Sequence, residues 1–391
     1  MDAIVDLDTG QFELNEEQRA IREMAETFAA DRVAPHALEW DRERHFPAEI
    51  IRETGPLGFG GIYVKDDVGG SGLGRLDAVL IFEALARACP AFSSFISIHN
   101  MAAWMIDTYG TEEQRQRFLP RLCSMELLAS YCLTEPGAGS DAAALKTRAV
   151  RSGGNGSDYV LNGTKQFISG AGGNELYVVM ARTGEDGPKG VSTFVVEKGT
   201  PGLSFGPNER KMGWHMQETR QVVFEDCKVP AENRLSGEGV GFRIAMAGLD
   251  GGRLNIAACS LGGAQSALDK ALAYAGERKA FGKAINQFQA LQFKLADMET
   301  ELQAARLLLY AAASKLDRKA PDAGKWSAMA KRLVTDTGFA VANEALQIHG
   351  GYGYLHEYGI EKLVRDLRVH QILEGTNEIM RVIIARHLVG K

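Results

Sequence analysis

The chain has 391 residues, of which 45% are hydrophobic and 24% charged, which is typical of ordinary globular proteins. This length predicts two to three domains and a core large enough to fold without disulfides or a structural metal. The net charge of −6, without a Lys/Arg-rich run, argues against nucleic-acid binding. Five scattered cysteines with no CxxC pair favour a reducing compartment and argue against a zinc site.

The sequence also argues against membrane insertion and against a targeting segment. The longest stretch without a charge lies between Arg87 and Asp107, but it contains Pro90 and several polar residues. We therefore expect buried helix and loop there. The acidic N-terminus has no basic residue before Arg19, unlike a secretory signal or a transit peptide. We expect a cytoplasmic bacterial protein, or a mitochondrial matrix protein if this is a processed eukaryotic chain.

Residues 1–127 are predicted to form an N-terminal helical domain. Asn15 and Gln18 have the spacing of a capping box, in which each side chain bonds the backbone N–H of the other residue. Glycine clusters separate the first helix from further helices predicted over 77–88 and 102–122.

Residues 128–232 are predicted to form a central β-domain. Short β-rich runs occupy 159–161, 166–169, 176–181, 191–197 and 221–224. Asn162-Gly163 lies between the first two runs and predicts a hairpin turn, because both residues tolerate positive φ. Strands this short, without intervening helices, predict an antiparallel sandwich or barrel.

Residues 233–391 are predicted to form a C-terminal four-helix bundle. Apolar residues recur at helical intervals over 242–275, 288–316, 326–348 and 377–388. The predicted fold class is therefore mainly α, with helices at both ends of the chain and a small β-domain between them.

Two glycine-rich segments are candidates for ligand contact. Residues 137–142 fit G-x-G-x-x-A, but only about eight residues precede the next glycine cluster, too few for the crossover helix of a Rossmann fold. A loop that contacts a phosphate or a planar ring, or a simple tight turn, remains. Residues 349–354 contain three glycines, more than a helix C-cap requires, and could approach phosphates closely. An oxyanion loop of the lipase type is excluded because the chain has no G-x-S-x-G.

Three further positions carry possible chemistry. Glu374 follows an apolar helical stretch, and Gly375 and Thr376 after it predict a break and restart of the helix. At such a junction Glu374 could be a base of raised pKa or an ordinary surface glutamate. Gly251-Gly252, within 250–253, costs a helix about 1 kcal/mol per glycine. Such a pair makes room either for a ligand or for helix packing. Arg278 is either an exposed charge or a phosphate clamp.

Together these segments resemble the acyl-CoA dehydrogenase family over nearly the whole chain. The motifs, in order, are YCLTEPGAGSD at 131–141, FISG at 167–170, RKAFG at 278–282, QIHGGYG at 347–353 and LEGTNE at 373–378. The resemblance implies an oxidoreductase with one FAD per subunit, a homotetramer, an acyl-CoA thioester substrate and electron-transfer flavoprotein as electron acceptor.

The resemblance also assigns binding residues by motif match, with no metal ligand among them. The implied FAD contacts are Tyr131, Leu133, Thr134, Gly139, Ser140, Phe167, Ile168, Ser169, Arg278, Phe281, Phe288, Gln289, Gln347, Ile348, Gly350, Gly351, Thr376, Asn377 and Glu378. Of these, Arg278, Phe288 and Gln289 are expected to reach FAD across a subunit interface. The implied acyl-CoA contacts are Ser140, Asp250, Gly251, Gly252, Arg253, Gly375 and Arg386.

Glu374 matches the family's catalytic base. One branch takes its base instead from the position before the arginine of D-x-x-R, which here is Gly252 and cannot act. The implied reaction removes the α-proton with Glu374 and passes the β-hydride to FAD N5, giving a trans-2-enoyl thioester.

The segments 97–101, 167–172 and 249–253 are most similar to the branch that acts on isobutyryl-CoA in valine breakdown. The alternatives are another short-chain or 2-methyl-branched acyl-CoA dehydrogenase, an acyl-CoA oxidase, or a flavin-free scaffold protein.

Overall fold

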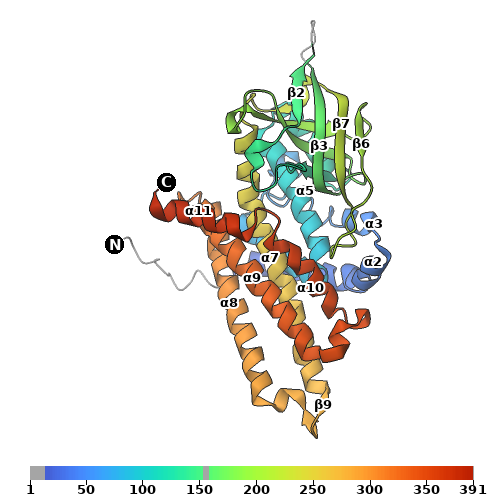
Figure 1. Ribbon diagram of the computed structural model, residues 1–391, viewed down its shortest axis with the longest axis vertical. Helices are drawn as coiled ribbons and strands as arrows, with labels where there is room; N and C mark the ends of the chain where they lie inside the picture. The colour runs from blue at the N-terminus through green and yellow to red at the C-terminus, as the bar shows by residue number, and fades with distance from the viewer. Residues whose placement is uncertain (1–13, 153–157, 391) are drawn as a thin grey trace.

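The computed structural model describes residues 14–152 and 158–390, and its layout is helices, a central sheet and a C-terminal helix bundle (Figure 1). In this view the sheet lies at the top and the long C-terminal helices run downward from it. The predicted fold class is confirmed.

The N-terminal helices follow the capping signals of the sequence. They are α1 (Glu16–Phe28), α2 (Ala37–Glu43), α3 (Ala48–Arg52), α4 (Arg75–Ala88), α5 (Pro90–Tyr109) and α6 (Glu112–Cys123). The predicted capping box is confirmed: Asn15 Oδ1 accepts from the Gln18 N–H at 2.8 Å, and Gln18 Oε1 accepts from the Asn15 N–H at 3.2 Å. The prediction of one continuous helix over 102–122 is wrong. Gly110 ends α5, and Thr111 caps α6.

The central sheet is mainly antiparallel. Its strands are β1 (Ala129–Cys132), β2 (Arg148–Arg151), β3 (Tyr159–Ser169), β4 (Leu176–Arg182), β5 (Val191–Glu197), β6 (Leu203–Phe205), β7 (Thr219–Val229) and β8 (Arg234–Leu235). The strand order is β6-β7-β3-β2-β4-β5-β8, and β1 pairs with β4. The β1–β4 and β2–β4 pairs are parallel, so the sheet is less regular than the antiparallel arrangement predicted.

The predicted hairpin at Asn162-Gly163 is wrong, because β3 continues through both residues. The register with β7 shifts between Leu161 and Gly163, as in a β-bulge. A Cβ at Gly163 would lie 2.5 Å from Thr147 Oγ1. The glycine therefore allows β2 to approach β3 closely and does not form a turn.

The C-terminal bundle is built on α7 (Gly241–Glu277), which packs against α4, α5 and α9. The predicted helices are present as α7, α8 (Gln289–Asp317), α9 (Ala323–His349) and α11 (Asn377–Val389). A short helix, α10 (Ile360–Arg368), lies in the region before Glu374 for which the sequence predicted a helical stretch, and it packs on α7 and α9. The strands β9 (Lys279–Ala280) and β10 (Lys283–Ala284) form a small hairpin after α7.

Within the described ranges, none of the helices is both long enough and apolar enough to cross a membrane. Nor do three or more His, Cys, Asp or Glu side chains of these residues gather into an arrangement that could hold a metal ion.

Candidate active site

Glu374 lies in a tight turn between the 3₁₀ segment Val369–Gln371 and α11. Its φ is +57° and that of Gly375 is +85°. The left-handed conformation costs a residue with a side chain about 1–2 kcal/mol, so the surroundings must hold it. Thr376 ends the turn as the N-cap of α11, because its Oγ1 accepts from the Ile379 N–H at 3.3 Å. The predicted break and restart of the helix is confirmed.

The carboxyl of Glu374 lies against the double glycine of α7. A Cβ at Gly252 would be 2.4 Å from Glu374 Oε2, and a Cβ at Gly251 would be 2.4 Å from Arg75 Nη1. The two glycines are buried inside an unbroken helix. They therefore make room for the side chains of Glu374 and Arg75.

The environment of Glu374 suits a general base. Its Oε2 is buried and has no hydrogen-bond partner among the described residues. Burial raises the pKa of Glu374 to about 7, although the positive charges of Arg253 and Lys331 oppose this. Unpartnered oxygen and a pKa near neutrality are what proton abstraction at physiological pH requires.

Arg253 connects Glu374 to α7. It is 5% exposed, and its Nη1 pairs with Asp250 Oδ1 at 2.5 Å. Its Nε donates to the backbone carbonyl oxygen of Glu374 at 3.4 Å. The predicted 250–253 segment and the predicted base are therefore in direct contact.

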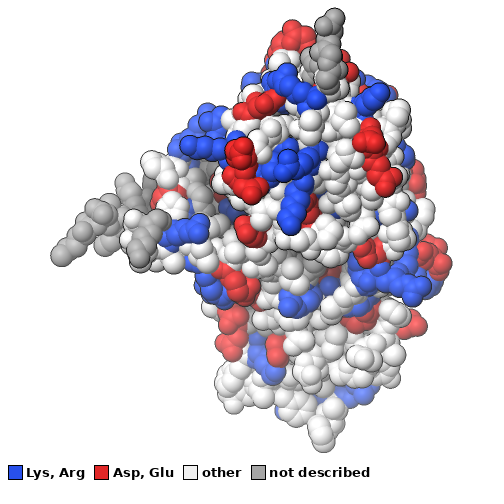
Figure 2. Space-filling view, turned by 45° about the horizontal axis from the view of Figure 1, so that its top comes forward, with Lys and Arg blue, Asp and Glu red and all other residues white. Residues whose placement is uncertain are grey.

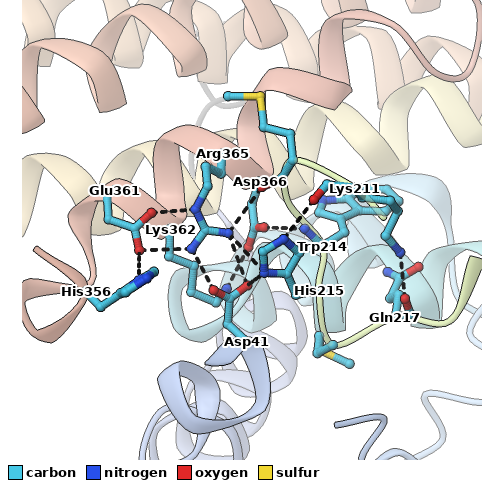
Figure 3. A network of polar contacts seen from close by, with 12 residues as sticks. Asp41, Lys211, Trp214, His215, Gln217, His356, Glu361, Lys362, Arg365 and Asp366 are labelled. Atoms are coloured by element: carbon cyan, nitrogen blue, oxygen red, sulfur yellow. Dashed lines mark hydrogen bonds and ion pairs between the residues drawn. The ribbon is translucent and has the colours of Figure 1, made fainter. Parts of the chain in front are cut away.

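A polar network fixes the segment that leads into the Glu374 turn (Figure 3). Arg365 Nη2 of α10 donates to Asp41 Oδ2 of α2 at 2.6 Å, and the Trp214 N–H donates to Asp366 Oδ1 at 2.6 Å. Burial alone would raise the pKa of Asp41, but hydrogen bonds from His215 and Arg365 hold it below its ordinary value. The network ties α10 to the N-terminal helices and so anchors the chain just before Glu374.

The structure brings together two of the predicted flavin-contact segments, 131–140 and 167–169. The Gln166 N–H donates to the Thr134 carbonyl at 2.8 Å, and Ser130 Oγ donates to the Ser169 carbonyl at 2.7 Å. Phe167 has φ +59° and a 65% exposed side chain. Nothing lies within 4 Å of a Cβ built at Gly139. An aromatic ring and open backbone therefore face outward beside β1.

A second cluster lies at the far end of α7, around a cavity of about 380 Å³. Its walls are Tyr274, Arg278, Ile285, Ile348, His349, Gly350, Gly351, Tyr352 and Leu355. A Cβ at Gly350 or Gly351 would meet no atom within 4 Å. An exposed guanidinium and open glycine backbone are suited to a phosphate.

The Glu374 site and the Arg278 cavity lie far apart within one chain. Arg253 and Arg278 are separated by 25 residues of helix, a rise of about 37 Å at 1.5 Å per residue. The single chain therefore does not bring its Arg278 cavity to its own Glu374.

Several predicted contacts stay predictions. Gln289, Gln347, Glu378 and Arg386 are exposed, and Asn377 is buried with its amide bonded to α9 side chains. Sequence reasoning missed Lys331, whose Nζ donates to the Gly375 carbonyl at 2.8 Å. The signal was a lysine on the buried face of the helix predicted over 326–348.

Comparisons with known proteins define the class. The chain matches the acyl-CoA dehydrogenase N-terminal domain over residues 15–126, the middle domain over 130–227 and the C-terminal domain over 239–389. The chain belongs to the acyl-CoA dehydrogenase family, and it is an FAD-dependent oxidoreductase.

Two relatives are mitochondrial isobutyryl-CoA dehydrogenases. The Bos taurus protein is 54% identical over 376 residues, and the Dictyostelium discoideum protein 56% identical over 376; each match covers 96% of this chain and 90% of the relative. Among solved structures, butyryl-CoA dehydrogenase from Megasphaera elsdenii has a TM-score of 0.94 and 40% identity, covering 97% of this chain and 99% of that one.

The residues present fit FAD. The exposed Phe167 ring beside the open loop 131–140 suits a planar ring system. The Arg278 cavity, with Gly350 and Gly351, suits a pyrophosphate.

The raised pKa predicts the pH dependence of the reaction. A base with a pKa of about 7 is mostly protonated below that pH, so kcat/KM for the acyl-CoA substrate should rise with pH through about 7. Initial rates at low substrate concentration across this range measure it. A kcat/KM already at its plateau near pH 5 would contradict a buried base.

Proposed function

We propose that this protein dehydrogenates isobutyryl-CoA to methacrylyl-CoA, with Glu374 as the base that removes the α-proton. The observation that carries the proposal is the buried Oε2 of Glu374, which has no hydrogen-bond partner among the described residues and lies next to Gly252, together with a pKa of about 7. The choice of acyl group is supported by 54% and 56% identity to two isobutyryl-CoA dehydrogenases. A role in valine breakdown would follow from this substrate.

The geometry of the turn supports proton abstraction. An α-proton is acidic enough for a carboxylate only if the thioester carbonyl is polarised. The Glu374 N–H has no acceptor among the described residues, so it is free to donate to that oxygen. The strained turn thus offers a base and a hydrogen-bond donor from one residue. FAD, when bound, supplies the acceptor for the hydride that leaves the β-carbon.

The side chains around Gly252 support a short acyl group. Gly248 and Gly252 lie one turn apart on α7, and α5 covers them with Met105 and Met101. A Cβ at Gly248 would be 2.0 Å from Met105 Cε, and one at Gly252 would be 3.1 Å from Met101 Sδ. The bulk of two methionines therefore lies next to Gly252, and we expect it to limit the length of the acyl chain that fits there.

The substrate is tested by comparing kcat/KM for isobutyryl-CoA, n-butyryl-CoA, 2-methylbutyryl-CoA and n-octanoyl-CoA with an artificial electron acceptor. Isobutyryl-CoA is expected to have the highest value and n-octanoyl-CoA the lowest. A higher value for 2-methylbutyryl-CoA or n-butyryl-CoA would replace isobutyryl-CoA as the substrate and keep the reaction class.

We also propose a homotetramer in which the Arg278 cluster serves the FAD of a neighbouring subunit. Support comes from the distance between the Glu374 site and the Arg278 cavity, and from exposed apolar side chains near the Arg278 cavity. Phe281 is 95% exposed and Phe293 58% exposed. In Figure 2 the lower end of the molecule carries mostly uncharged side chains. Electron-transfer flavoprotein is the proposed electron acceptor, as for the family.

Arg278→Ala is expected to lower the flavin content of the purified protein and to weaken its assembly, because the cavity loses its cation. Absorbance gives the flavin-to-protein ratio, and light scattering gives the mass. Lys279→Ala, at the adjacent exposed position, is the control and should retain full flavin. Normal flavin content in Arg278→Ala would count against the cofactor role.

A further inference from the structure

Lys331 is a buried lysine whose Nζ makes no direct contact with a carboxylate among the described residues. It lies on α9 with 0% exposure, and no carboxylate oxygen among the described residues is within 4.0 Å of its Nζ. Burying an unpaired ammonium is costly, and such residues are rare outside functional sites. The groups that the Lys331 ammonium contacts therefore indicate the role of this residue.

The ammonium binds the turn that carries the base. Its Nζ donates to the Gly375 carbonyl oxygen and to Asn377 Oδ1, each at 2.8 Å. Arg253 Nε donates to the preceding carbonyl, that of Glu374, at 3.4 Å. Cations from α7 and α9 thus hold consecutive carbonyl groups of two residues with positive φ.

Further hydrogen bonds complete the anchor on α9. The Asn377 amide Nδ2 donates to Thr335 Oγ1 at 3.0 Å and to Asp336 Oδ1 at 2.7 Å. Thr335 Oγ1 donates to the Lys331 carbonyl at 2.8 Å. These bonds orient Asn377 so that its oxygen faces the ammonium.

The charges around Lys331 make Glu374 its main electrostatic partner. Burial lowers the pKa of Lys331 to about 7; the carboxylates of Glu374 and Asp336 oppose this, followed by Glu378, while Arg253 reinforces it. Asp336 is shared with two arginines, Arg332 at 3.8 Å and Arg381 at 3.6 Å. His370 is neutral near pH 7, because burial lowers its pKa to about 3.

We propose that Lys331 is a positioning residue for the catalytic base. Its ammonium holds the Gly375 carbonyl and thereby keeps the Glu374 carboxyl over Gly252, and its charge favours the ionised carboxylate. The assignment rests on the proposed function in taking Glu374 as the base. The base and the lysine titrate as a pair, since each charge stabilises the other.

Two substitutions separate the hydrogen bonding of Lys331 to the turn from the effect of its charge on Glu374. Lys331→Met removes the charge and both hydrogen bonds, and is expected to lower kcat about 10- to 100-fold by releasing the turn. Lys331→Gln keeps a donor but no charge, and should lose less kcat. In both variants, the rising part of the pH–rate profile should shift to higher pH by about one unit. The reason is that a nearby cation lowers the pKa of a carboxyl group, and both variants lack that cation. Lys294→Met removes an exposed cation of α8 that pairs with Glu344, away from this anchor, and should leave the pH–rate profile in place.

A second readout needs no turnover. The infrared carbonyl stretch of protonated Glu374, identified by its loss in Glu374→Gln, gives the titration of the base directly in the purified holoenzyme. Upward shifts of this titration in Lys331→Gln and Lys331→Met support the proposal, and an unchanged titration in Lys331→Gln overturns it. Should Lys331→Met fail to fold, Lys331→Gln decides alone. If the wild type oxidises none of the acyl-CoAs but the titration still shifts, the proposed function fails and the coupling of Lys331 to Glu374 stands.

Discussion

Glu374→Gln is expected to lower kcat for acyl-CoA dehydrogenation by about 10²- to 10⁴-fold, the contribution typical of a positioned general base. Glutamine has nearly the same shape and fits over Gly252, but it cannot accept the α-proton. FAD content and affinity for acyl-CoA should stay close to those of the wild type. Single-turnover reduction of the flavin measures the chemical step. A rate within tenfold of the wild type would show that another group is the base.

The same variant carries a prediction for stability. Native Glu374 has a pKa raised from 4.5 to about 7. The stability that comes from binding this proton is fully present below pH 4.5 and is lost as the pH rises through 7. Gln does not ionise, so above pH 7 the variant should be more stable than the wild type by up to about 3 kcal/mol. Denaturant unfolding at pH 5 and pH 8 tests this, and a difference that does not grow with pH would argue against a buried carboxyl.

Gly252→Ala is expected to leave the fold intact and to lower kcat about 100-fold. The new Cβ would lie 2.4 Å from Glu374 Oε2 and 3.0 Å from its Cδ. These atoms end a flexible side chain, so the carboxyl can move away at little cost in stability. Displacement of a base by about 1 Å is enough for a loss of this size. Steady-state kinetics and thermal unfolding measure the two effects separately.

Gly276→Ala is the matched control on the same helix. Its Cβ would meet only Asn286 Nδ2, at 3.6 Å, and it lies far along α7 from the base. Activity should be unchanged, and the unfolding free energy should rise by at most about 1 kcal/mol. A large activity loss in both variants would mean that α7 is sensitive to any added methyl group.

Local signals in the sequence were enough to predict the turn at Glu374, while the role of Glu374 as the base stays a proposal. Glu374 between an apolar stretch and Gly375-Thr376 predicted a break and a new helix, and α11 does start at that point. The Gly251-Gly252 pair predicted that a helix must leave room for something. That the occupants are the side chains of Glu374 and Arg75 depends on chain segments far apart in sequence, which no local pattern specifies.

The features that the sequence did not predict also depend on contacts between segments far apart in the chain. Asn162-Gly163 has the composition of a hairpin turn, but tertiary contact of Gly163 with Thr147 determines its conformation. Lys331 lies within the helix predicted over 326–348, but its partner, the Gly375 carbonyl, is known only from the fold. The domain limits at 127 and 232 stay a prediction.

The most direct test of the account is the visible spectrum of the purified holoenzyme during anaerobic addition of isobutyryl-CoA. The account predicts a flavin spectrum that bleaches on addition in the wild type, and that persists on the same timescale in Glu374→Gln. Bleaching at equal rates in both proteins, or a purified protein without flavin, would contradict it.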